Sequence, residues 1–225
     1  MKKIGLLGAY DKTDLIIYIA RILADNRKKT LIVDSTTLQK TRYTVPCIAP
    51  SRCYVTTYED IDVAVGFDSM KEIKNYYGKD ELDYDYILID IDDNKKINEF
   101  ELQDAFKNYF VTAFDNYSLK KGMEIIGKTG KKKKMTKVLF SREMKQEEDD
   151  YLNFLSFYYD VEWEKDAIYF PYEIGDGTVI MENQRNSRIS FKELSIEYRS
   201  GLLAITSQIA PEIKKSEIKR ILKNV

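Results

Sequence analysis

Three short apolar runs dominate the pattern of hydrophobic and polar positions along the chain. They lie within residues 3–7, 30–34 and 86–90, and none of them alternates regularly between apolar and polar side chains. A strand covered on one face only would alternate, so unbroken runs of this length predict strands that are buried on both faces. We therefore expect these three strands at the centre of a parallel sheet.

Further strands and helices follow one another around these runs. Short β-prone stretches predict the other strands, at residues 54–57, 61–65, 109–113, 136–140 and 167–170. Apolar residues at helical spacing predict helices after Thr13, at residues 69–77, 100–108, 119–126, 147–158 and 191–209, and after Pro211. Strands that alternate with helices predict an α/β fold, a doubly wound, mostly parallel sheet with helices on both faces.

The composition fits one α/β domain over residues 1–210, followed by a basic amphipathic helix over residues 211–225. The 225 residues are 44% hydrophobic and 32% charged, with a formal net charge of −1, so no global field draws the molecule to nucleic acid or to anionic lipid. No apolar run approaches the roughly 20 residues of a membrane span, and no signal-peptide pattern follows the first lysines. We expect a cytoplasmic protein.

The chain has no histidine and two cysteines, Cys47 and Cys53. Histidine is the usual general base and the commonest metal ligand, so its absence argues against Ser-His-Asp, Cys-His and zinc chemistry. We expect the two cysteines to be reduced thiols.

The first predicted strand opens directly into a glycine-started turn and then into a helix. Residues 7–14 read Leu-Gly-Ala-Tyr-Asp-Lys-Thr-Asp. A strand, a turn beginning with glycine, a Lys-Thr pair and a helix form the layout of a phosphate-binding P-loop. The candidate nucleotide-binding residues are Gly8, Ala9, Tyr10, Asp11, Lys12 and Thr13.

Acidic residues end the other two central strands. Because the carboxyl ends of parallel strands meet at one edge of the sheet, Asp34 and Asp90 are expected to lie beside Gly8. Ligands of doubly wound folds bind at that edge. The sequence thus predicts one site that contains all three residues.

With these motifs the chain resembles the ParA/MinD family of deviant P-loop ATPases. Residues 7–14 match the family's Lys-Gly-Gly-Val-Gly-Lys-Thr-Thr loop, residues 34–36 its Asp-x-Asp strand end, and residues 84–92 its Tyr-Asp-x-Ile-Ile-Ile-Asp-x-Pro run. Segments 111–119, 140–142 and 170–172 match later motifs in order, so the resemblance covers nearly the whole chain. It implies ATP or ADP with Mg²⁺ as cofactor, with magnesium near Thr13, Asp34 and Asp90. It also implies base contacts from Ser141, Arg142 and Pro171.

The chain departs from the family pattern at the positions that carry the chemistry. Ala9 and Asp11 replace loop glycines, and Leu7 replaces the signature lysine that resembles a cation reaching across a nucleotide-sandwich dimer. Thr36 replaces the acid that in the family positions the attacking water, and Asp92 replaces the proline of the switch. We therefore expect ATP-Mg²⁺ to bind weakly or not at all, and turnover to be negligible.

Two explanations of a poor site follow from the loop residues. The carboxylates of Asp11 and Asp14 would repel a triphosphate, in which case Asp11→Gly should improve binding. Alternatively the ring of Tyr10 folds over Gly8 and Ala9 and fills the pocket, so that Tyr10→Gly would be needed as well.

The basic residues near the C-terminus suggest a second surface. Apolar residues of the last helix fall on one face among lysines, as in the membrane tail of the MinD branch, although a helix docked on the domain would show the same pattern. The candidate membrane or partner surface comprises Lys214, Lys215, Ile218, Lys219, Ile221 and Leu222. Residues 131–134 are four lysines in a basic turn, either solvated or in contact with nucleic acid or an acidic partner.

Taken with the resemblance, these features favour a ParA/MinD-like protein whose ATPase site has decayed. Such a protein would act as a binding or positioning component of a larger machine, in secretion, pilus assembly, conjugation or partition. Protein partners are expected, and nucleic acid less so. The alternatives are a working ATPase that binds ATP-Mg²⁺ and forms a homodimer on it, and an adaptor held peripherally at the inner membrane face by the last helix.

Overall fold

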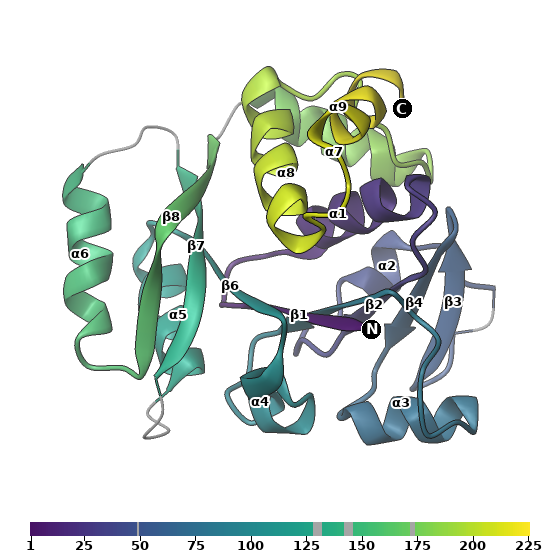
Figure 1. Ribbon diagram of the computed structural model, residues 1–225, viewed down its shortest axis with the longest axis horizontal. Coiled ribbons are helices and arrows are strands. Elements are labelled where there is room, and N and C mark those ends of the chain that lie inside the picture. Colours follow the sequence, from purple (N-terminus) through teal and green to yellow (C-terminus); the bar gives the residue numbers. More distant parts are fainter. Residues whose placement is uncertain (49, 128–131, 142–145, 172–173) are drawn as a thin grey trace.

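One twisted sheet runs through the whole molecule (Figure 1). The computed structural model describes residues 1–48, 50–127, 132–141, 146–171 and 174–225. Across these residues the strand order is β3-β4-β2-β5-β1-β6-β7-β8. All neighbours are parallel except β3 and β4, which form an antiparallel pair. The strands are β1 (Lys2–Leu7), β2 (Thr30–Asp34), β3 (Tyr54–Tyr58), β4 (Ile61–Val65), β5 (Tyr86–Ile91), β6 (Lys107–Ala113), β7 (Lys133–Ser141) and β8 (Val161–Pro171).

Helices cover both faces of the sheet, as the alternation of elements predicts. On one face lie α1 (Thr13–Asp25), α7 (Ile174–Arg185), α8 (Ile196–Ile209) and α9 (Lys215–Asn224). On the other lie α3 (Met70–Tyr77), α4 (Lys96–Glu99), α5 (Asn116–Ile126) and α6 (Gln146–Ser156). A short helix α2 (Thr41–Thr44) follows β2, and a 3-10 turn η1 (Leu102–Asp104) precedes β6. The predicted doubly wound α/β fold is confirmed.

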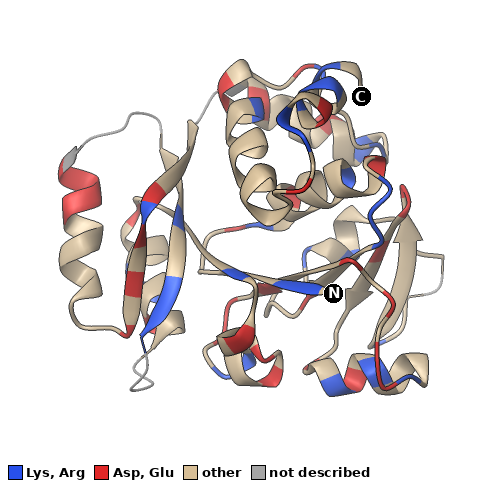
Figure 2. Ribbon diagram, in the orientation of Figure 1, with Lys and Arg blue, Asp and Glu red and all other residues tan. Residues whose placement is uncertain are grey.

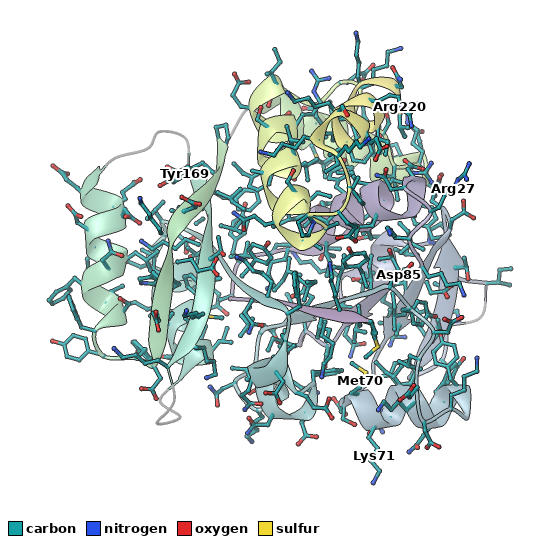
Figure 3. The ribbon with its side chains drawn as sticks, in the orientation of Figure 1. Arg27, Met70, Lys71, Asp85, Tyr169 and Arg220 are labelled. Carbon is teal, nitrogen blue, oxygen red and sulfur yellow. The ribbon has the colours of Figure 1, made fainter. Side chains whose placement is uncertain are left out.

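The unbroken apolar runs feed two separate cores. In β5, Leu88 packs with α1 and α8 on one face, whereas Ile87 and Ile89 pack on the opposite face. All three side chains are fully buried. Side chains fill the layers between the sheet and its helices in Figure 3. Successive residues of the strand therefore pack alternately into one core and then the other. This is why these strands show no polar alternation.

Two predictions about elements are wrong, and one helix was not predicted. Residues 100–108 form no α-helix, because the chain passes through the short 3-10 helix η1 and Lys107 pairs with Ile4 of β1. Helix α7 was not predicted, since Gly175 and Gly177 weaken its helical signal. Helix α8 begins at Ile196, later than expected.

The start of α8 is fixed by two side chains. Ser195 caps the helix by accepting a hydrogen bond from the N–H of Tyr198 at 3.0 Å. Buried Asp176 of α7 accepts bonds from the N–H and the hydroxyl of Ser195, at 2.6 and 2.7 Å. This contact joins α7 to the start of α8, directly after the turn closed by the hydrogen bond from the N–H of Leu194 to the carbonyl oxygen of Phe191.

The last helix docks on the domain. Ile218, Ile221 and Leu222 are buried in the core shared with α1 and α8, while Lys214, Lys215, Lys219 and Arg220 remain exposed. Arg220 lies on the outer side of α9 in Figure 3. The expectation of a membrane surface that includes the three apolar residues is therefore not met, because docking covers them. None of the described helices is long and apolar enough to cross a membrane.

Candidate functional site

The carboxyl ends of the central strands bring the predicted residues together. Asp34 of β2 is the register partner of Asp90 of β5, and Asp90 in turn pairs with Leu6 of β1, two residues before Gly8. Gly8 has φ of +143°, and a Cβ placed there would lie 2.2 Å from the carbonyl oxygen of Val111. Only glycine fits this crossing of the loop over β6.

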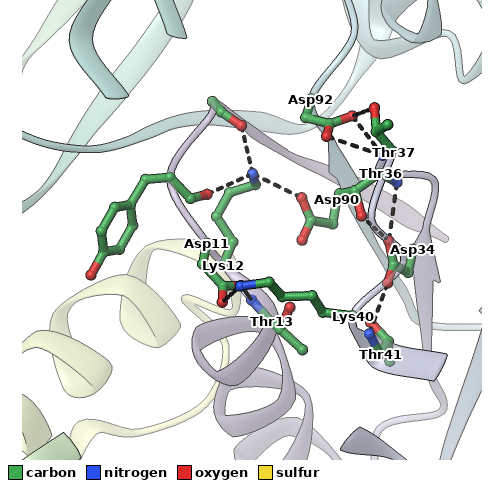
Figure 4. Close-up of polar contacts among 12 residues, drawn as sticks. Asp11, Lys12, Thr13, Asp34, Thr36, Thr37, Lys40, Thr41, Asp90 and Asp92 are labelled. Carbon is green, nitrogen blue, oxygen red and sulfur yellow. Dashed lines mark hydrogen bonds and ion pairs between the residues drawn. The ribbon is translucent and has the colours of Figure 1, made fainter. Parts of the chain in front are cut away.

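Lys12 turns back into its own loop (Figure 4). Its Nζ donates hydrogen bonds to the carbonyl oxygens of Gly8 and Tyr10, at 2.7 and 3.0 Å. The same Nζ lies 3.0 Å from Oδ1 of Asp90. Both side chains are about 97% buried, since Lys12 and Asp90 are each 3% exposed. The lysine that would reach a phosphate thus holds the loop and a neighbouring strand together.

The environment of Asp90 is unusual for a carboxylate. Burial raises its pKa to about 7, the ion pair with Lys12 opposes this shift, and the neighbouring charge of Asp34 adds to it. The Lys12–Asp90 pair is thus a buried ion pair that costs much to break.

Both carboxylate oxygens of Asp34 accept local hydrogen bonds. Its Oδ1 accepts from the N–H and hydroxyl of Thr36, at 3.0 and 2.6 Å, and its Oδ2 accepts from the N–H of Thr41 at 3.0 Å. Thr36, which stands in place of the family's second acid, therefore serves to fix Asp34. Asp92 is engaged in a similar way and accepts from both the N–H and the hydroxyl of Thr37.

Asp11 is paired within the protein. Its Oδ2 lies 2.6 Å from Nζ of Lys40, and its Oδ1 accepts from the N–H of Thr13 at 3.0 Å at the start of α1. Burial would raise the pKa of Asp11, but the hydrogen bonds from Lys40 and Thr13 together lower it below its usual value. Lys40 thus compensates the negative charge that the sequence placed at the rim.

Asp14 stands on the first turn of α1. Burial raises its pKa to about 6, a hydrogen bond from Gln184 opposes the shift, and the charge of Asp11 adds to it. The Nε2 of Gln184 donates to Oδ1 of Asp14 at 2.7 Å. Since Gln184 belongs to α7, this bond joins two segments that are far apart in the sequence.

The ring of Tyr10 stacks on Phe140 of β7, with centroids 4.8 Å apart, and Phe140 stacks on Phe170 of β8 at 5.0 Å. Tyr10 is thereby anchored to the sheet by its ring, while its carbonyl oxygen accepts the bond from Lys12.

The loop does not form the cradle that phosphate needs. Among residues 8–13 only Gly8 has positive φ, whereas an anion-binding nest needs successive N–H groups turned inward by alternating backbone conformations. The cavity bounded by Ala9, Lys12, Thr13 and Asp90 measures about 70 Å³. Nucleotide-sized ligands occupy roughly 300–1,000 Å³.

These observations test the fit of ATP-Mg²⁺. Lys12 is bonded to Asp90, Asp34 is bonded to Thr36 and Thr41, and Thr13 is buried. In the described part of the chain no group of three or more acidic or cysteine side chains is placed to hold a metal ion. As arranged here, the residues present do not fit a nucleotide with its magnesium.

Two of the residues implied to contact a base lie at the carboxyl ends of β7 and β8. Ser141 and Pro171 are register partners on β7 and β8, and both line a groove of about 430 Å³ beside α8. Tyr169, labelled in Figure 3, lines the same groove. Arg142 lies outside the described residues, as does Lys131 of the basic segment. Lys133, which was expected in a turn, begins β7.

Sequence reasoning missed Lys40, Thr41 and Gln184 as parts of the site. Lys40 and Thr41 lie in a segment that looks like a polar loop, and nothing local marks them as partners of Asp11 and Asp34. The position of Asp34 before a polar loop was a usable signal for Thr36, since Asp side chains commonly accept a hydrogen bond from the backbone N–H two residues on.

Comparison with known proteins adds to this geometry. No protein-family model and no curated protein matches the chain. Solved structures do. MinD in the MinC:MinD cell division complex of Aquifex aeolicus is 15% identical, with a TM-score of 0.56 over 95% of this chain and 97% of that one. The Borrelia burgdorferi protein BB_S35 bound to AMPPNP is 11% identical, with a TM-score of 0.56 over 94% and 99%. A ParA family ATPase from Chlorobium tepidum is 12% identical, with a TM-score of 0.53 over 98% and 95%. The strand order, the loop layout and these three likenesses agree: the chain has the fold of the ParA and MinD ATPases.

Proposed function

We propose that this protein is a ParA/MinD-like component whose ATPase site has decayed, and that it acts by binding or positioning partners within a larger machine. The observation that carries the proposal is the position of Lys12. Its ammonium group is bonded to Gly8, Tyr10 and Asp90 inside the protein. A nucleotide would have to break a buried ion pair before the lysine could reach a phosphate.

The engaged acids support the same conclusion. Both oxygens of Asp34 accept hydrogen bonds from Thr36 and Thr41, so a water molecule or metal ion at Asp34 would have to displace these donors or share the oxygens with them. Several separate hydrogen bonds would have to be exchanged together. The cost of this rearrangement is the reason that we expect turnover to be negligible.

Helix α6 and the turn after it support a role in protein binding. Four large aromatic side chains are exposed within eight residues, at fractions from 39% to 83%: Tyr151, Phe154, Phe157 and Tyr158. Single exposed apolar residues are common, but a cluster of aromatic rings marks an interaction surface. We call these four residues the α6 aromatic face.

Acidic residues lie beside the α6 aromatic face. The first turn of α6 contains Glu147, Glu148 and Asp149, visible as the acidic end of the helix in Figure 2. A partner of complementary chemistry would present apolar side chains flanked by Lys or Arg. We therefore propose a protein segment of this kind as the occupant. Among proteins of the same fold, the Aquifex aeolicus MinD was solved in a complex with MinC, which is consistent with protein partners.

The decayed site is tested by nucleotide titration and steady-state hydrolysis on the full chain. Calorimetry should give no ATP-Mg²⁺ affinity tighter than about 100 μM, and the rate should equal the background. The variants to compare are Lys12→Ala, and Lys12→Met/Asp90→Asn, which removes both members of the ion pair. Sub-micromolar binding that both variants abolish, or a hydrolysis rate that both variants abolish, would replace the proposal by its rival, a working ATPase that dimerises on nucleotide.

The partner surface is tested by cross-linking in cells from a photoreactive residue at position 157. The control is the same residue at position 43, because Tyr43 is exposed and lies outside the α6 aromatic face. A protein captured only from position 157 is then purified. Its affinity should fall at least tenfold with Phe154→Ala/Phe157→Ala and stay unchanged with Tyr43→Ala. Equal effects of the two changes would contradict this surface.

A further inference from the structure

A second pocket lies at the opposite edge of the sheet from the loop of Gly8. It is formed at the amino ends of β6 and β7 and measures about 720 Å³. This volume falls within the range of small-molecule sites, roughly 300–1,000 Å³, and is ten times that of the cavity at Lys12. We call it the amino-edge pocket.

Lysines dominate the charge of the amino-edge pocket. Lys107 comes from the start of β6, Lys133 and Lys134 from the start of β7, and Lys132 from just before it. The carboxylates in the lining are Asp104 and Glu164, so the pocket has a net charge of +2 in a chain of net charge −1. Lys132, Lys133 and Lys134 belong to the basic segment at residues 131–134, which has no role in the proposed function.

The carboxylate nearest the lysines is already engaged. Glu164 forms an ion pair with Lys107 and accepts a hydrogen bond from Thr136. Within the described residues, neither Lys132 nor Lys134 has a carboxylate oxygen within 4 Å. Two ammonium groups of the pocket are therefore available to an anion.

Lys133 adds a buried positive charge. The residue is 7% exposed, and its Nζ donates a hydrogen bond to the carbonyl oxygen of Ile126 at 3.1 Å. Burial lowers the pKa of Lys133, and the charge of Asp160 opposes this shift. An anion in the pocket would stabilise the buried ammonium group.

One apolar ring completes the rim. Phe106 is 49% exposed and lines the amino-edge pocket next to Lys107. A ring beside several ammonium groups suits a ligand that has both a flat or apolar part and phosphate groups. The concave shape and the two carboxylates favour a small molecule over a nucleic-acid strand, which needs an extended basic surface.

We propose that the amino-edge pocket binds a small molecule of nucleotide size that carries two or more phosphate groups. Lys132 and Lys134 contact the phosphates directly. Lys133 supplies a fixed positive charge below them, and Phe106 lies against the rest of the ligand. This site is independent of the loop at Lys12 and needs no magnesium.

The test is calorimetric titration of the full chain with tripolyphosphate and with ATP, both without magnesium. Binding should be weakened at least tenfold by Lys132→Glu/Lys134→Glu. The matched control is Lys219→Glu/Lys223→Glu on α9, which makes the same change of charge at exposed lysines and should alter affinity less than twofold. Lys132→Gln/Lys134→Gln provides a milder variant, and circular dichroism checks that each one is folded.

Further measurements distinguish binding at the amino-edge pocket from binding at the loop of Lys12, and a small-molecule ligand from DNA or a membrane. Binding that persists in Lys12→Met/Asp90→Asn supports the amino-edge pocket, whereas binding lost there and kept in Lys132→Glu/Lys134→Glu overturns it and places the ligand at the loop. The proposal is also overturned if tripolyphosphate does not bind at millimolar concentration, or if both glutamate pairs weaken binding equally. Much tighter, Lys132- and Lys134-dependent binding of single-stranded DNA or anionic vesicles would overturn the small-molecule assignment.

Discussion

The ammonium group of Lys12 lies 3.0 Å from Oδ1 of Asp90, and both side chains are almost fully buried. This ion pair joins the loop after β1 to the carboxyl end of β5. In a P-loop ATPase the corresponding lysine is needed at the phosphates. Here the ammonium group instead joins two parts of the fold, and our proposal of a decayed ATPase site rests on this position.

Lys12→Met should therefore destabilise the protein, by about 3 kcal/mol at pH 8, because it leaves the Asp90 carboxylate buried without its partner. Without Lys12 the pKa of Asp90 rises further above its unfolded value. Between about pH 4 and that raised pKa the native state binds a proton that the unfolded state has released, so stability falls as pH rises. Urea unfolding should show a smaller loss at pH 5 than at pH 8. Lys12→Met/Asp90→Asn should recover most of the stability, and no recovery would show that the ion pair is not the cause.

Asp11→Gly should improve ATP-Mg²⁺ binding, by about tenfold, or 1.4 kcal/mol. The change removes a carboxylate from the rim and also releases Lys40, whose Nζ lies 2.6 Å from Asp11. Asp11→Asn is the matched control, because it removes the charge but keeps an acceptor for the N–H of Thr13. Equal gains in the two variants would assign the effect to charge. No gain in either would leave the Lys12–Asp90 pair as the main barrier, with Tyr10→Gly as the next change to test.

Gly8→Ala should destabilise the protein by about 3 kcal/mol, because the added Cβ would lie 2.2 Å from the carbonyl oxygen of Val111 at a φ that alanine avoids. Gly78→Ala is the control. Gly78 also has positive φ, +62°, yet nothing lies within 4 Å of its added Cβ, so about 1 kcal/mol of backbone strain is expected. Thermal unfolding measures both variants, and equal losses would mean that contact with β6 adds nothing to the strain.

Asp14→Asn should stabilise the protein at pH 8 by about 1 kcal/mol. The folded pKa of Asp14 is raised to about 6, so between about pH 4 and 6 the native state retains a proton that the unfolded state loses. Stability therefore falls as pH rises through this window, and the cost is complete above it. The asparagine keeps an acceptor for Gln184 and removes the titration. Glu193→Gln, at an exposed position, should leave the pH profile unchanged, whereas an unchanged profile in Asp14→Asn would disprove the assignment.

Local sequence determined the fold and the location of the candidate site. Residues 3–7, 30–34 and 86–90 lack polar alternation because both faces of their strands are buried, and that property is visible in the residues themselves. Gly8, Asp34 and Asp90 follow or end these strands, and parallel strands bring their carboxyl ends to one edge. These predictions required no knowledge of which side chains contact one another in the folded protein.

Tertiary structure decided which side chains meet at that edge. Lys40 with Asp11, and Gln184 with Asp14, pair across 29 and 170 residues of chain. Docking of α9 likewise decided that Ile218, Ile221 and Leu222 are core residues. The sequence pattern of an apolar helix face is the same whether the helix binds a membrane or packs on its own domain. The sequence specifies each side chain's chemistry, but pairing depends on the path of the whole chain, and only packing places Lys12 against Asp90.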